Sequence, residues 1–240
     1  MDNSAENQEK IAAMIGGRGL DEDSYLVFVT RNGTVKRMPL SALRNIRTSG
    51  IRALTLDEGD ELMSVFETTG DEDILIATAN GMAVCFNEQD VRAMSRTAVG
   101  VRGIRLREGD RVVGAGSTAQ GSSILSVTEN GYGKRTALTE YLRTGPNGEK
   151  QAQSRGGKGL KNYNITPKTG NVAGCRVVSE SDDVMLIENG GVIIRIPASS
   201  INVYKRDVQG VIVMRIDDGN QVVSLERVEK MDEEETGEQA

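Results

Sequence analysis

Four runs of aliphatic and β-branched residues recur along the chain, and each run ends at an Asn-Gly pair. The runs cover residues 25–33 (YLVFVTRNG), 74–81 (ILIATANG), 124–131 (ILSVTENG) and 184–190 (VMLIENG). Asn-Gly favours a type I′ turn, in which two residues with positive φ join two antiparallel strands. The pattern predicts four β-hairpins. The Asn-Gly pairs are 48, 50 and 59 residues apart, which is within the range of four-stranded propeller blades.

A second signal follows each hairpin, where two glycines enclose a short segment. The pairs are Gly50 and Gly59, Gly100 and Gly109, Gly159 and Gly170, and Gly210 and Gly219. Alternating residues between the glycines, as at 104–106 and 213–216, predict a third strand in each repeat. The aliphatic residues after the second glycine, at 61–65, 111–115 and 221–225, predict a fourth strand.

These repeats predict an all-β, propeller-like domain of four-stranded antiparallel blades at residues 24–228. The expected repeats are 24–70, 71–119, 120–180 and 181–228. Residues 7–15 read like another copy of the fourth strand, so we expect residues 1–23 to hold the remnant of a preceding blade and a linker. The chain is then expected to be part of a longer polypeptide. Residues 229–240 (EKMDEEETGEQA) are typical of a disordered acidic tail.

Charge is segregated along the chain, although the net charge is −6. Residues 1–23 and 229–240 are acidic, whereas residues 91–161 hold 13 Lys and Arg against 5 Asp and Glu. Basic residues also return to equivalent positions of the repeats: four residues before the first glycine of the pair, two residues after it, and just past the hairpin turn. A basic belt of this kind predicts a polyanion partner. The candidate DNA-binding residues are Lys36, Arg37, Arg47, Arg52, Arg92, Arg96, Arg102, Arg105, Lys134, Arg135, Arg143, Arg155, Gly156, Gly157, Lys158, Gly159, Lys161, Lys205 and Arg206.

The composition and the motifs give no indication of a catalytic site. The chain has no His, which removes the commonest general base and metal ligand. No nucleophile elbow, zinc-ligand spacing or nucleotide-binding loop occurs, so we expect no catalytic residue, metal or cofactor in this chain. Cys85 and Cys175 are expected to be buried, reduced thiols. No apolar run is long enough to cross a membrane.

The third repeat carries an insertion that contains residues 153–159 (QSRGGKG). This segment resembles the Q-R-R-G-G-K-G motif, the GyrA box, of the DNA gyrase A C-terminal domain, with Ser154 in place of the first Arg. Residues 91–94 (VRAM), 97–106 (TAVGVRGIRL) and 129–136 (ENGYGKRT) resemble the same family. The similarity runs from about Glu9 to Val228. The motif stands here in a late repeat, whereas the family has its defining box in the first blade.

The resemblance implies a six-bladed β-pinwheel, whose blades exchange strands, with the four repeats as its last four blades. It further implies a domain without catalysis that wraps duplex DNA for ATP-dependent negative supercoiling. The implied partners are double-stranded DNA, the gyrase A strand-passage module and the gyrase B subunit. Elsewhere in the holoenzyme, ATP and Mg²⁺ are used. The implied location is the bacterial cytoplasm, associated with the nucleoid.

Two alternatives remain open from the sequence. The equivalent domain of topoisomerase IV would bind DNA without strong wrapping. A propeller scaffold for protein partners would present apolar or aromatic patches, and the chain has only five Tyr, three Phe and no Trp.

Overall fold

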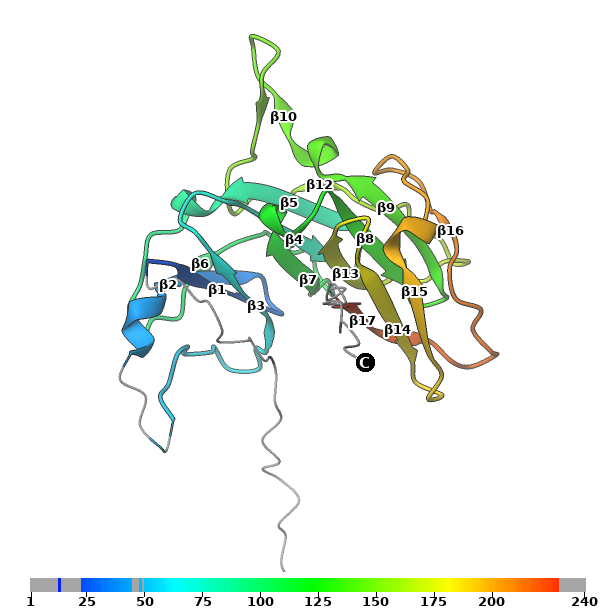
Figure 1. Cartoon of the computed structure of the whole chain (residues 1–240), viewed down its shortest axis with the longest axis horizontal. Helices are drawn as coiled ribbons and strands as arrows, with labels where there is room; N and C mark the ends of the chain where they lie inside the picture. Colours follow the sequence, from blue (N-terminus) through cyan, green and yellow to red (C-terminus); the bar gives the residue numbers. More distant parts are fainter. Residues whose placement is uncertain (1–12, 14–22, 45–47, 49, 229–240) are drawn as a thin grey trace, which may run out of the picture.

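The computed structural model describes residues 13, 23–44, 48 and 50–228. Within this part, the chain forms four successive antiparallel sheets around a common centre, together with one short ribbon (Figure 1). The only helical segments there are five short 3-10 turns. The predicted all-β, propeller-like fold is confirmed. Three of the sheets have four strands, and the last has three.

Each sheet is built on one of the four predicted hairpins. In the first three hairpins, the first strand is buried on both faces. In the first of them, one face packs against the second blade and the other against residues of its own repeat, including Leu40, Leu54 and Leu62. The hairpin strands are β1 (Tyr25–Thr30) with β2 (Thr34–Pro39), β4 (Asp73–Thr78) with β5 (Met82–Asn87), β8 (Ser123–Thr128) with β9 (Tyr132–Ala137), and β14 (Asp183–Glu188) with β15 (Ile193–Pro197).

The hairpin turns differ from the predicted type I′ geometry. No residue other than glycine has a positive φ in the described part of the chain, so Asn32 and its equivalents do not. In the first turn, the Gly33 amide donates to the Thr30 carbonyl at 3.1 Å, and Gly33 alone has a positive φ of 84°. This is a type I turn followed by a left-handed glycine. Three residues separate the strands, so one positive φ is enough to close the turn. In the fourth hairpin, Gly191 takes this role instead of Gly190.

The predicted fourth strands are confirmed, and they form the inner edge of the sheets. Each pairs with the first strand of its own hairpin, and successive inner strands contact each other. They surround a central cavity of about 620 Å³. The inner strands are β3 (Leu62–Thr68), β7 (Val112–Ser117), β13 (Val172–Val178) and β17 (Val222–Val228).

The third strands are shorter than predicted, and they belong to the preceding sheet. β6 (Val101–Arg102) of the second repeat pairs with β2, β12 (Leu160–Lys161) of the third with β5, and β16 (Val211–Ile212) of the fourth with β9. Each therefore forms the outermost strand of a neighbour's sheet. This is the strand exchange that the family resemblance implied.

The expectation of strands at 104–106 and 213–216 is wrong for a physical reason. After two paired residues, the chain folds around the carbonyl of the turn glycine in the preceding blade. The amides of Gly103 and Ile104 both donate to the Gly33 carbonyl, at 2.8 and 3.3 Å. Ile104 is then buried between the first two blades instead of alternating along a strand. Val213 and Met214 repeat the arrangement on the Gly131 carbonyl.

Both cysteines are free and buried, as predicted. Cys85 lies on β5 and Cys175 on β13. Burial raises the pKa of the Cys85 thiol to about 12 and that of Cys175 to about 11.

Other sequence predictions lie outside the described residues. They are the extra strand at 7–15, apart from Ala13, the acidic tail at 229–240, and Arg47. The described part contains no helix with the length and apolar character of a membrane span.

Candidate nucleic-acid interface

The outermost strands carry exposed basic side chains at equivalent positions. Arg102 lies on β6 opposite Thr34, and Lys161 lies on β12 opposite Met82. Both are exposed, and the fourth repeat has Ile212 at this position. The exchanged strands thus place positive charge on the edge of the sheets that faces away from the central cavity.

The box segment of the third repeat packs directly against the exchanged strand of the second. The Gly156 amide donates to the Gly103 carbonyl at 2.7 Å, and the Arg105 amide donates to the Gly157 carbonyl at 2.8 Å. Gly156 has a φ of 78°, so glycine is required at this turn. Gly159, with a φ of 72°, would place a Cβ 2.3 Å from the Ala83 carbonyl oxygen, which only glycine avoids.

This packing brings four predicted basic residues together: Arg102, Arg105, Arg155 and Lys158. We call them the box cluster. Arg102, Arg105 and Lys158 are exposed, and their side chains have no hydrogen bond or ion pair within the described part of the chain. The fourth, Arg155, has a different role. Its Nε donates to the Asp90 carbonyl at 3.0 Å, and its Nη1 donates to the Arg102 carbonyl.

Arg206 repeats the Arg155 contact in the next repeat. It donates from Nη1 to the Lys161 carbonyl at 2.8 Å, and its Nε lies 3.9 Å from Oε2 of Glu140. Arg155 and Arg206 both stand four residues before the first glycine of their pair, and their acceptors stand two residues after it in the preceding repeat. The two arginines therefore fasten consecutive repeats through the backbone of the residue that presents the outer cation.

Two of the predicted DNA-binding cations lie inside the protein, contrary to the prediction of a continuous basic perimeter. Lys36 and Lys134 are completely buried. The Lys36 ammonium donates to the carbonyls of Ala53 and Arg96, both at 2.7 Å. Lys134 donates to the carbonyls of Lys205 and Arg206, both at 2.6 Å. Each lysine thus holds the loop of the following repeat, where the candidate residues Arg96, Lys205 and Arg206 are located.

Burial sets the titration of these lysines. Desolvation lowers the pKa of both ammonium groups, and that of Lys134 falls to about 8 despite the nearby carboxylate of Asp207. The Lys134 ammonium also lies 5.1 Å from the centre of the Tyr163 ring. A buried ammonium with two carbonyl acceptors is a structural link, so neither lysine is placed to contact a phosphate.

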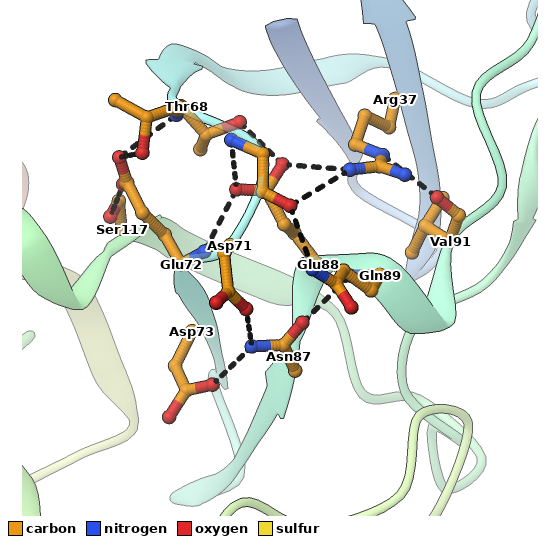
Figure 2. Close-up of polar contacts among 12 residues, drawn as sticks. Arg37, Thr68, Asp71, Glu72, Asp73, Asn87, Glu88, Gln89, Val91 and Ser117 are labelled. Carbon is orange, nitrogen blue, oxygen red and sulfur yellow. Dashed lines mark hydrogen bonds and ion pairs between the residues drawn. The ribbon is translucent and has the colours of Figure 1, made fainter.

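Arg37 and Arg135 are also buried, so their predicted place on the perimeter is wrong as well. Their Nε atoms donate to the carbonyls of Val91 and Ile201 in the next repeat, at 2.9 and 2.7 Å. Figure 2 shows that Arg37 also contacts Glu88, at 3.3 Å. The sequence placed these cations just past the hairpin turns, but the middle residues of β2 and β9 are buried on both faces, and the guanidinium groups bind carbonyls of the next repeat.

Glu88 is the centre of a buried polar network that joins the first two blades (Figure 2). Its Oε1 accepts hydrogen bonds from the amides of Gly70 and Glu72, both at 2.9 Å. Its Oε2 accepts from Thr68 at 2.7 Å and from Arg37. The carboxylate thus links β3 of one blade with the loop that precedes β4 of the next.

The other predicted residues are distributed over the loops. Arg143 is exposed on a ribbon formed by β10 (Arg143–Thr144) and β11 (Lys150–Gln151). Lys161 is exposed, although its Nζ donates to Asn164 at 2.8 Å. The remaining exposed candidates are Arg52, Arg92, Arg96 and Lys205.

Sequence reasoning missed Lys150, an exposed cation on the same ribbon. The signal was present as Gly145-Pro146-Asn147-Gly148, a turn sequence inside the insertion of the third repeat. Tyr141 and Tyr163 are buried packing residues. Burial raises the pKa of both phenols.

Inner strands around a cavity, and outer strands given to the preceding blade, define a propeller of the strand-exchanging, pinwheel type. The model of the family described as "DNA gyrase C-terminal domain, beta-propeller" matches residues 24–69, 72–119, 122–150, 151–179 and 182–229. The chain belongs to this family, and the resemblance seen in the sequence is confirmed.

The full-length relatives are named as DNA gyrase A subunits. The protein of Clostridium acetobutylicum is 49% identical over 227 residues, which are 95% of this chain and 26% of the relative. The protein of Staphylococcus aureus is 42% identical over 236 residues, or 97% of this chain and 26% of the relative. The chain thus spans about a quarter of the length of these relatives.

Solved structures of the same architecture come from two kinds of topoisomerase. A DNA gyrase A C-terminal domain has a TM-score of 0.75 at 28% identity, covering 88% of this chain and 68% of that one. The C-terminal domain of a DNA topoisomerase IV has a TM-score of 0.77 at 28% identity, covering 90% and 64%. The fold alone therefore does not separate gyrase from topoisomerase IV.

Proposed function

We propose that this chain binds duplex DNA along the outer edge of its sheets and wraps it, in support of negative supercoiling by a DNA gyrase. The observation that carries the proposal is the box cluster, together with Lys161. Four of these cations, Arg102, Arg105, Lys158 and Lys161, are exposed in a family named for DNA gyrase. Arg102 and Lys161 occupy equivalent positions on the outermost strands. Lys and Arg on such an edge neutralise phosphates and release counterions, which gives affinity that depends on salt and not on base sequence.

The basic residues divide into two groups under this proposal. Arg102, Arg105, Lys158 and Lys161 contact phosphates. Arg155 and Arg206 hold the backbone of Arg102 and Lys161. Lys36 and Lys134 hold the loops that carry Arg96, Lys205 and Arg206. Bending 20–30 base pairs by 40–90° costs about 1–6 kcal/mol. Several phosphate contacts on successive blades would offset that cost, because the blades follow one another around a common centre.

The wider assignments belong to the same proposal. DNA cleavage, strand passage and the use of ATP and Mg²⁺ would reside in other parts of the holoenzyme, namely the gyrase A strand-passage module and the gyrase B subunit. Residues 24–228 would form the DNA-binding unit of the bacterial, nucleoid-associated enzyme. Among the described residues, no group of three or more His, Cys, Asp or Glu side chains is placed to hold a metal ion.

A ligation assay tests wrapping. Nicked circular plasmid is sealed with ligase at rising protein concentration, and the topoisomers are resolved by electrophoresis. Wrapping should shift the linking number progressively, and Arg102→Ala/Lys158→Ala should reduce the shift. The control is Arg176→Ala, which removes a cation that lines the central cavity instead of the outer edge and whose ion-pair partner, Glu226, is exposed.

The topoisomerase IV alternative gives a different result. Binding that retards DNA without changing the linking number would favour a domain that contacts DNA but does not wrap it. Absence of binding at low salt would reject the DNA-binding proposal, and the protein-scaffold alternative would then be preferred.

A further inference from the structure

The β10–β11 ribbon is an insertion of nine residues, 143–151, into a loop that is otherwise the same in three repeats. In each of these loops, one main-chain amide donates a hydrogen bond to a main-chain carbonyl on a strand of the preceding repeat. The pairs are Met94 with Arg37 at 2.8 Å, Gln153 with Cys85 at 2.7 Å, and Tyr204 with Arg135 at 2.8 Å. Three positions separate Val91 from Met94 and Ile201 from Tyr204, but twelve separate Tyr141 from Gln153. The extra residues lie between Leu142 and Ala152, and the fold of the blade does not depend on them.

The ribbon is an ordered element that projects away from the sheets (Figure 1). Arg143 pairs with Gln151 and Thr144 with Lys150. At its tip, the Gly148 amide donates to the Gly145 carbonyl at 3.0 Å, with a φ of 83° at Gly148. The carboxylate of Glu149 accepts hydrogen bonds from the Asn147 amide at 2.9 Å and from the Gln151 side chain at 2.8 Å.

We propose that this ribbon enters the major groove of the duplex that the outer edge of the protein binds. The inference rests on the proposed DNA-binding function and extends it from phosphate contacts to a groove contact. A two-stranded β-ribbon has the width that the major groove of B-DNA admits. The ribbon ends at Gln151, four residues before Arg155, so DNA bound at the box cluster would pass close to the base of the ribbon.

The side chains of the ribbon fit nucleic acid better than a protein surface. Arg143 and Lys150 are exposed on opposite strands, and Thr144, Asn147 and Gln151 are exposed polar residues. Within the ribbon, Lys150 donates to the Thr144 hydroxyl at 3.0 Å. Residues 143–151 contain no large apolar side chain, which a docking surface for a protein would need. Glu149 is the one acid, and its oxygens already bind groups of the ribbon itself. The ribbon would fix the rotational setting of the DNA on the protein.

The test compares two duplexes of one sequence. In one of them, the cytosines carry a glucosylated hydroxymethyl group, which fills the major groove. The variants are an excision of residues 143–151, which leaves a loop of the length found in the second and fourth repeats, and Arg143→Ala/Lys150→Ala, which keeps the ribbon. Binding is measured by titration, and a minor-groove ligand such as netropsin serves as the groove control.

The wild-type chain should bind the glucosylated duplex at least several-fold more weakly than the plain duplex, and the excision variant should bind both about equally. For the double substitution, the loss of affinity on glucosylation should lie between the losses of the wild type and the excision variant. This variant keeps the ribbon, so it tests the inference even if the excision variant does not fold. Equal binding of both duplexes by the wild-type chain, or equal sensitivity in wild type and excision variant, would overturn the inference. Failure of the wild-type chain to bind plain DNA would instead overturn the proposed function.

Discussion

The guanidinium of Arg155 donates a hydrogen bond to the main-chain carbonyl of Arg102 in the preceding repeat. Arg206 makes the equivalent contact with Lys161. In both cases a guanidinium group binds the main-chain carbonyl of another basic residue, and the side chain of that second residue stays exposed. Basic residues that are indistinguishable in the sequence therefore have separate roles, one in holding the edge and the other in contacting DNA.

Lys158→Ala should weaken DNA binding without changing stability. Its ammonium has no partner in the described part of the chain, so removing it leaves nothing unsatisfied. Loss of one phosphate contact should reduce the salt dependence of log K by about 1, while the free energy of unfolding changes by less than about 0.5 kcal/mol. Binding titrations between about 50 and 200 mM salt measure the slope.

Arg155→Ala is the informative comparison. It removes two hydrogen bonds from a charged group to carbonyls, so the free energy of unfolding should fall by about 1–3 kcal/mol, in addition to any loss of affinity. Urea denaturation measures the difference. An Arg155→Ala protein as stable as the Lys158→Ala protein would contradict the holding role.

The buried ammonium of Lys134 should contribute strongly to stability. Lys134→Met keeps the length of the side chain but leaves the Lys205 and Arg206 carbonyls without their donor. A buried carbonyl without a partner costs about 1–3 kcal/mol, and these two contacts are only partly buried, so we expect a total loss of at least about 2 kcal/mol in urea denaturation. Lys205→Ala, which changes an exposed side chain of the same loop, is the control and should have little effect on stability.

The pH dependence of stability gives an independent test of the same lysine. The folded-state pKa of Lys134 is about 8, below its usual value of 10.5, because burial disfavours the charged form. Between these values the unfolded chain binds more protons than the folded chain, so stability should rise with pH through this group. The neutral amine still has two N–H donors for its two carbonyls. The difference in free energy of unfolding between wild type and Lys134→Met should therefore grow from pH 8 to 10.5, and a constant difference would contradict the burial effect.

The sequence predicted the hairpins and inner strands because aliphatic runs and turn glycines are local signals. Gly33, Gly81 and Gly131 are found at the turns where the Asn-Gly pairs placed them. The exchange of β6, β12 and β16 between blades is not a local property. A two-residue strand has no periodicity to read, and its partner lies in another repeat. Only the family resemblance implied it.

The candidate DNA-binding site was also predicted only in part, because the burial of a basic residue depends on contacts between repeats. The box motif identified Lys158 correctly as exposed, and repeat position identified Arg102 and Lys161. Repeat position was wrong for other residues. It misplaced Lys36 and Lys134, because charged residues beside a turn were expected to be solvated. The strands that carry these lysines, β2 and β9, are buried on both faces, and carbonyls of the next repeat replace water around the ammonium groups. Which cations are buried depends on the packing of adjacent blades, and one repeat does not contain that information.

The last prediction concerns Glu88, whose buried carboxylate joins two blades (Figure 2). Glu88→Gln replaces one oxygen by an NH₂ group, which would face N–H or O–H donors on either side. It also leaves the guanidinium of Arg37, with a side chain 11% exposed, without its counterion. Breaking a buried pair from one side costs about 3–5 kcal/mol. The thermal midpoint should therefore fall by many degrees in calorimetry. Glu226→Gln, which breaks an ion pair with Arg176 where the glutamate side chain is 53% exposed, should cost less than about 1 kcal/mol. If the two variants lose equal stability, the Glu88 network does not join the blades in the way the structure indicates.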